Sequence, residues 1–241
     1  MTQFLIVILY ALLPAAGNLL GAVLAECVRP PKWVIGATLH GAAGIAIALI
    51  SIELMPRVLD DLPMWGIVVA FSLGAATSVA MARGIKSIQG VGQRQSFRAW
   101  MVYAVIGADL FSDGLMTGAG TAVAQDLGLL LAGAQLFANV PGGFAATANL
   151  RQHRVTRTRR TTVAFLMFVP VILSALSGYT ILRTAPEFVN AAAISFIIGV
   201  LLLATIEDMV PEGDAPRPPR WSSTLAFSLG FAGLALISQY L

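Results

Sequence analysis

Stretches of about 20 apolar residues, the length that a helix needs to cross a bilayer, recur along almost the whole of this chain. Of its 241 residues, 57% are apolar and only 11% are charged, whereas about one residue in four is charged in a soluble domain. So few charges cannot coat a water-facing globule of this size, which excludes an ordinary soluble enzyme, a disordered chain and a DNA-binding domain. We therefore expect a polytopic membrane protein.

The apolar windows predict eight spans within one polytopic membrane domain, residues 1–241. They run near 4–26, 33–56, 64–83, 99–124, 127–150, 161–183, 188–210 and 221–240. Helices are expected because a helix satisfies its own backbone hydrogen bonds in lipid, and because the windows lack the polar–apolar alternation of barrel strands. The predicted fold class is an all-α membrane protein.

Basic residues fall almost entirely in the loops after spans 1, 3, 5 and 7. Of the 15 Lys and Arg residues, only Arg57 and Arg183 lie in the other loops. The loop after span 3, for example, holds Arg83, Lys86, Arg94 and Arg98. The positive-inside rule places these loops in the cytoplasm and both termini outside the cell (inner) membrane. Membrane topology is sufficient to explain the basic clusters. We therefore expect the lipid bilayer to be a partner of this protein, and we expect no binding of nucleic acid.

Spans 2 and 7 end alike. Gly44–Pro56 and Gly199–Pro211 have the same length, and an acid, Glu53 or Asp208, stands three residues before each proline. Span 2 runs outward and span 7 runs inward, so the two segments would be inverted copies, as is common in secondary transporters. This similarity predicts a 3+2+3 inverted-repeat bundle in which spans 4 and 5 form the middle. In such a bundle one block of helices is expected to slide or rock against the other.

Span 4 carries two acids about halfway across the membrane. Asp109 and Asp113 are four residues apart, so they lie on one helix face, one turn from each other. An aspartate at the bilayer centre costs about 2.5–3.5 kcal/mol on insertion scales, and two stacked aspartates also repel. No Lys or Arg lies in the interior of an expected span. The neutralising partner is therefore either a bound cation or a proton held between the acids.

Span 5 offers a facing surface of oxygen ligands. Gln135 and Asn139 supply amide oxygens, and Pro141 leaves a carbonyl one turn earlier without its helical partner. Gly142 and Gly143 let another backbone or an ion come close. Such oxygen ligands suit hard divalent cations. The alternative is a kinked packing helix whose amides bond neighbouring helices.

These patterns predict a metal site, a pathway and several packing positions. The metal site is formed by Asp109, Asp113 and Asn139. The candidate pathway residues are Glu53, His40, Gln135, Glu207 and Asp208. The backbone-shaping residues are Gly114, Pro141, Gly142, Gly143 and Pro170. Gly17-x-x-x-Gly21 and Gly114-x-x-x-Gly118 indicate close helix packing.

At these residues the sequence resembles the ZIP family of metal transporters. The resemblance covers the eight spans, the outward termini, the 3+2+3 arrangement, the longer loop after span 3 and the shared endings of spans 2 and 7. It implies a metal site midway across the membrane, a homodimer and movement of divalent cations, zinc among them, toward the cytoplasm.

The family's ligand positions are only partly kept. In span 4 the family's histidine falls on Asp109 and its glutamate on Asp113. In span 5 its acid falls on Asn139 and its glutamate on Gly142, and in span 6 its glutamate falls on Val169. Without an imidazole or thiolate at the centre, the donor set favours a harder cation such as manganese or magnesium, or weak binding of zinc, and allows at most one metal site.

We therefore expect a transporter whose substrate is a divalent metal ion, with no cofactor. No enzyme activity is expected, because both acids lie on one span and Ser112 has no nearby base. Two alternatives stay open. In the first, the acid pair carries protons or couples them to another solute. In the second, the protein is a non-transporting relative with a relict site.

Overall fold

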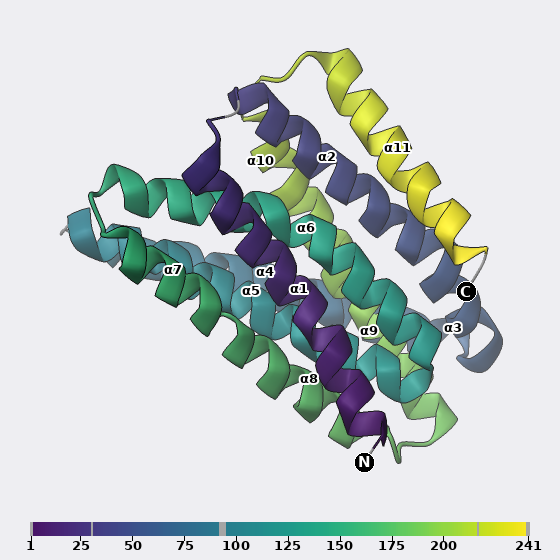
Figure 1. The fold of residues 1–241 in the computed structure, drawn as a ribbon. Coiled ribbons are helices and arrows are strands. Elements are labelled where there is room, and N and C mark those ends of the chain that lie inside the picture. Colours follow the sequence, from purple (N-terminus) through teal and green to yellow (C-terminus); the bar gives the residue numbers. More distant parts are fainter. Residues whose placement is uncertain (1, 30, 92–94, 216, 240–241) are drawn as a thin grey trace. The chain divides into compact units, whose positions relative to one another are not determined.

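The computed structural model describes residues 2–29, 31–91, 95–215 and 217–239, with the side chains of all of these except Lys32, 85–91 and 95–105. In this part of the chain every regular element is a helix, as Figure 1 shows. The elements are α1 (Thr2–Cys27), α2 (Lys32–Ala48), η1 (Leu49–Leu54), α3 (Met55–Asp61), α4 (Met64–Val91), α5 (Gln95–Val123), α6 (Gln125–Gln152), α7 (Arg157–Leu166), α8 (Phe168–Leu182), α9 (Glu187–Ala204), η2 (Thr205–Met209), α10 (Val210–Asp214) and α11 (Arg220–Ser238). Arg94 lies outside the described residues, as do the side chains of Lys86 and Arg98.

Seven helical segments within the described residues are long and apolar enough to cross a membrane. They are Thr2–Cys27, Trp33–Asp61, Met64–Gly84, Gln125–Gln152, Arg157–Leu182, Glu187–Asp214 and Arg220–Ser238. The remaining predicted span, 99–124, falls in α5, which has 29 residues. The all-helical class and the multi-pass membrane character predicted from the sequence are confirmed.

Prolines explain where the long helices change their winding. The span made by α7 and α8 breaks at Met167, because Pro170 cannot donate to the carbonyl of Leu166 and its ring clashes there. Spans 2 and 7 pass through the π-helices η1 and η2 just before Pro56 and Pro211. At the end of each π-helix a backbone N–H bonds the carbonyl five residues earlier. Single π-turns of this kind are frequent at functional sites.

The chain divides into two compact units. Unit 1 comprises Met1–Arg29 and Arg83–Arg183, and therefore contains α1 and α5 to α8. Unit 2 comprises Pro30–Ala82 and Thr184–Leu241, and contains α2, η1, α3, most of α4, and α9 to α11. Each unit thus combines helices from both ends of the chain.

Helices in unit 1 pack through glycines at backbone contact distance. A Cβ at Gly17 or Gly21 of α1 would lie 2.0 Å from a carbonyl oxygen of α6. A Cβ at Gly118 of α5 would lie 1.9 Å from the Ala175 carbonyl oxygen of α8. Both small-x-x-x-small motifs therefore form the close contacts that the sequence predicts. The apolar core of the unit includes Val7, Ala11, Leu110, Leu150 and Val171.

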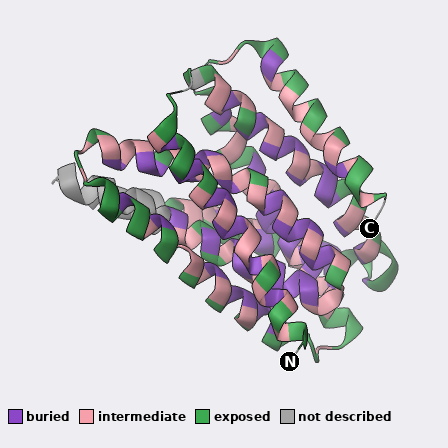
Figure 2. Cartoon of the chain, in the orientation of Figure 1, coloured by how far each residue is buried: buried purple, intermediate pink, exposed green. Residues whose placement is uncertain are grey.

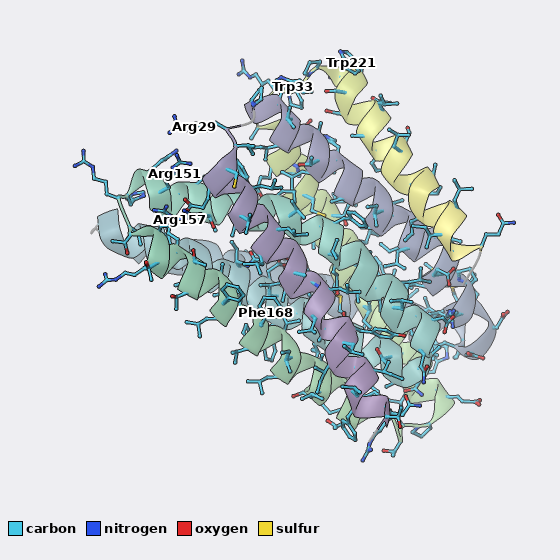
Figure 3. The ribbon with its side chains drawn as sticks, viewed as in Figure 1. Arg29, Trp33, Arg151, Arg157, Phe168 and Trp221 are labelled. Atoms are coloured by element: carbon cyan, nitrogen blue, oxygen red, sulfur yellow. The ribbon has the colours of Figure 1, made fainter. Side chains whose placement is uncertain are left out.

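Helices in unit 2 pack in the same manner. α2 lies along α11, and Trp33 and Trp221 stand at the same end of this pair (Figure 3). Both tryptophans are exposed, as is typical of side chains at a membrane–water interface.

Large apolar side chains cover the outer helix faces. Figure 2 shows exposed and intermediate residues along α8 and α11, and buried residues on the faces where helices of one unit meet. Leu173 and Ile181 on α8 and Leu229 on α11 are all more than half exposed. Apolar surface of this extent is unfavourable in water and favourable in lipid.

Candidate functional site

A buried carboxylate–amide pair joins α5 to α6 in the middle of unit 1. Asp113 is 8% exposed, and Asn139 Nδ2 donates to Asp113 Oδ2 at 2.6 Å and to the Gln135 carbonyl oxygen at 2.8 Å. Both partners of this nitrogen are acceptors, so the hydrogen bonds favour the amide orientation in which nitrogen faces Asp113. The carboxylate is therefore held by a neutral donor.

Two threonines extend this pair into a polar stripe. Thr117 Oγ1 donates to Gln135 Oε1 at 2.7 Å, and Thr121 Oγ1 donates to the Thr117 carbonyl oxygen at 2.7 Å. Both threonines are buried. Asp113, Thr117 and Thr121 are four residues apart, which places them on one face of α5. Sequence reasoning missed the threonines, although their spacing from Asp113 was a readable signal.

Asp109 differs from its neighbour in environment. It lies one turn from Asp113, close enough for the two charges to repel, but its side chain is exposed. In the described part of the chain, no three His, Cys, Asp or Glu side chains gather closely enough to hold a metal ion. An ion at this place would therefore need the amide oxygen of Asn139 or backbone carbonyls in addition to the two carboxylates.

The glycines and prolines predicted to shape the site have different surroundings. A Cβ at Gly114 would lie 2.2 Å from the Val171 carbonyl oxygen, so Gly114 fixes the contact of α5 with α8. Gly143 similarly lies against the Asn18 carbonyl oxygen, whereas no heavy atom comes within 4 Å of a Cβ placed on Gly142. Pro141 is buried inside α6, which continues to Gln152.

Two buried amides of unit 1 have side-chain atoms without a hydrogen-bond partner among the described residues. Asn18 on α1 is 1% exposed, and neither its Nδ2 nor its Oδ1 has a partner. Gln135 Nε2 is in the same condition. A buried polar atom without a partner costs about 1–3 kcal/mol, so such atoms mark places where a buried water or a substrate gains most by binding.

Asn18→Leu is expected to raise the midpoint of thermal unfolding by about 2–8 °C, because leucine is similar in size and removes two unpartnered polar atoms. The measurement is thermal unfolding in detergent without divalent cations. Asn18→Ala is the control, since it removes the same atoms but leaves a cavity and should lower the midpoint. Equal decreases in both variants would show that the amide has a bonding partner in the protein.

The other predicted pathway residues belong to unit 2. Glu53 in η1 accepts hydrogen bonds from Arg57, at 3.3 Å, and from Ser238 of α11. His40 on α2 is buried, with Nδ1 2.8 Å from the Gly36 carbonyl oxygen and Nε2 3.3 Å from Asp214 Oδ1. Sequence reasoning did not foresee Ser238 and Asp214 as partners, because both come from distant parts of the chain.

The remaining predicted pathway residues, Glu207 and Asp208, lie in η2 and are exposed. The structure thus brings together Asp113, Gln135 and Asn139 and places Asp109 one turn away. The pathway residues Glu53, His40, Glu207 and Asp208 lie in the other compact unit.

A comparison with models of known protein families found no match, and a comparison with curated proteins found none either. What the protein does must therefore be inferred from the chemistry of its own side chains. The buried acid on α5 is the most informative of them, because intramembrane acids are expensive and are usually functional.

Proposed function

We propose that this protein is a membrane transporter that carries divalent cations, with the carboxylate of Asp113 as the central ligand. The observation that carries the proposal is the burial of this acid between apolar helices with a neutral amide as its hydrogen-bond partner. An amide donor satisfies one lone pair of the carboxylate but leaves its charge. A cation from the membrane-crossing path supplies the missing positive charge.

The donor atoms around Asp113 are oxygens. Asp109 contributes a second carboxylate one turn away, and Asn139 contributes an amide oxygen once its side chain turns toward an ion. Oxygen donors without imidazole or thiolate favour manganese or magnesium over zinc. We place the protein in the cell (inner) membrane with both termini outside, moving ions toward the cytoplasm as a homodimer like the family it resembles.

The proposed architecture is the ZIP-like 3+2+3 inverted repeat, and contacts inside unit 2 support it. Four of the glycine–carbonyl contacts described there are Gly44 with Phe227 and Gly230 with Gly41 between spans 2 and 8, and Gly199 with Phe71 and Gly74 with Phe196 between spans 7 and 3. On each of these four helices, the contacting glycine and the residue that supplies the carbonyl oxygen are three residues apart. Span 2 therefore packs on span 8 as span 7 packs on span 3.

Contacts inside unit 1 follow the same rule. Gly21 contacts Val140 and Gly143 contacts Asn18 between spans 1 and 5, while Gly178 contacts Leu115 and Gly118 contacts Ala175 between spans 6 and 4. On each of these four helices, the contacting glycine and the residue that supplies the carbonyl oxygen are again three residues apart. Each compact unit therefore contains complete pairs of repeat-related spans, which is what a 3+2+3 repeat requires. Transport would then involve movement of one unit as a block.

One observation favours a second candidate, proton transport. Asn139 directs its nitrogen and not its oxygen toward Asp113, so its amide oxygen does not face the carboxylate as a second metal ligand would. A proton on Asp113 would also remove the repulsion from Asp109. In this case the stripe of Asp113, Thr117 and Gln135 would relay protons between α5 and α6.

The full-length protein in proteoliposomes distinguishes the two candidates. A cation-sensitive dye inside the vesicles should report uptake of manganese or magnesium, and the uptake should disappear in the double variant Asp109→Ala/Asp113→Ala. Unchanged uptake in the double variant would reject the site. A pH gradient that drives proton flux without added metal would favour the second candidate, and the absence of both fluxes would favour the non-transporting alternative.

A further inference from the structure

A cavity of about 120 Å³ lies at one end of unit 1, outside the proposed transport site. One face of α1 and one face of α7 form its walls, and Thr147 of α6 contributes to the lining. The α7 residues that line it, from Arg157 to Ala164, recur at helical spacing, so the cavity follows a single face of that helix. In Figure 3, Arg151 and Arg157 lie at this end of the unit.

The charges around the cavity do not cancel. Arg160 binds Glu26 with two hydrogen bonds, of 2.6 and 2.8 Å, so this pair is neutral as a whole. Arg151 is engaged with the Ala25 carbonyl oxygen. Among the residues that the structure describes, the guanidinium of Arg157 forms no ion pair, although its charge also acts on Glu26, which Arg160 already holds. The cavity therefore carries a net positive charge beside the hydroxyl groups of Thr147 and Thr161.

The first turn of α7 adds to this positive potential. The helix begins at Arg157, and its N-cap residue Thr156 makes no side-chain hydrogen bond to the free backbone N–H groups. These groups and the helix dipole favour an anion at this end. The guanidinium of Arg157 and the start of α7 thus act on the same place.

An apolar surface adjoins the charged part of the cavity. Leu19 and Val23 of α1 belong to the lining, and Val23 is half exposed. Ala22 of α1 and Ala164 of α7 complete the apolar part of the lining. A ligand that fits both parts has an anionic head and an apolar tail.

We propose that this cavity binds the headgroup phosphate of an anionic phospholipid. The phosphate accepts hydrogen bonds from Arg157 and the first turn of α7, and an acyl chain lies along Val23 and the neighbouring apolar residues. Basic pockets between membrane helices on the cytoplasmic side recognise such headgroups. The apolar flank distinguishes a lipid from free phosphate, which has nothing to place there.

The experiment compares Arg157→Gln with Arg159→Gln in the full-length protein in detergent. Arg159 is exposed on the same helix and does not line the cavity, so the two variants lose the same charge. Phosphatidylglycerol is titrated against thermal unfolding and counted as bound lipid by native mass spectrometry, with phosphatidylcholine as the neutral lipid. We expect Arg157→Gln to weaken phosphatidylglycerol binding roughly fivefold and Arg159→Gln to leave it unchanged.

A second variant keeps the charge and fills the cavity. Val23→Trp should reduce phosphatidylglycerol binding while Arg157 stays in place. Three results would overturn the proposal: equal losses in the two arginine variants, equal binding of phosphatidylcholine, or protection by inorganic phosphate that matches the lipid. None of these readouts depends on cation flux, so the result is independent of the proposed transport function.

Discussion

Asp113→Asn is expected to reduce cation flux by at least about 100-fold, because even the outer partners of a metal ligand contribute about 10–100-fold in affinity. The variant keeps the shape of the side chain and its contact with Asn139 but removes the charge. Its thermal stability in detergent should be unchanged or higher, since a buried charge is lost. The measurement is uptake into proteoliposomes together with thermal unfolding of the same preparation.

The pairing of the two readouts separates a transport role from a structural one. If Asp113 only holds α5 to α6, the asparagine variant should lose stability and flux in parallel. Asp60→Asn is the matched control, because Asp60 is an exposed acid in α3, and it should keep full flux.

The cation flux of Asn139→Leu should lie between those of wild type and Asp113→Asn. We expect a reduction of about tenfold, because Asn139 positions the carboxylate.

Gly143→Ala is expected to lower the midpoint of thermal unfolding by roughly 5–10 °C, because overpacking of a close helix contact costs about 1–3 kcal/mol. A Cβ at this position would lie 2.0 Å from the Asn18 carbonyl oxygen. The obstacle is backbone, so no change of rotamer relieves it, and α1 must move away from α6. The measurement is thermal unfolding in detergent.

The neighbouring residue provides the control. Gly142→Ala adds the same methyl group one residue earlier, where no heavy atom lies within 4 Å of the added carbon. It should be neutral or stabilising by up to about 1 kcal/mol, since alanine is the better helix former. Equal decreases in both variants would mean that the α1–α6 contact does not depend on Gly143.

The helices could be predicted from the sequence because membrane spans depend on local composition. A run of about 20 apolar residues becomes a helix in lipid wherever it packs, so each predicted window contains one. The π-helices η1 and η2 could not be predicted in detail. The matched endings Gly44–Pro56 and Gly199–Pro211 marked their positions, but a proline kink, a π-turn and a helix end have the same sequence signature.

The candidate site could be predicted in part. Asp113 and Asn139 stand out because a polar residue at the middle of a span is costly, and this needs no knowledge of neighbours. The bond between Thr117 and Gln135 could not be predicted, because it depends on how α5 and α6 are rotated against each other. The different exposure of Asp109 and Asp113 could not be predicted for the same reason. Two residues on one helix face can contact different neighbours, and the packing of the helices decides which.

The amino-acid sequence alone indicated a multi-pass helical membrane protein and where its acids lie along each helix. These properties follow from hydrophobicity and helix geometry, which act over a few turns. Only the tertiary structure decided which acid is buried, which amide donates to it, and that Arg160 and not Arg157 binds Glu26. These features depend on contacts between residues far apart in the chain. Glycines such as Gly118 and Gly143, at which two helix backbones come into contact, determine which residues meet.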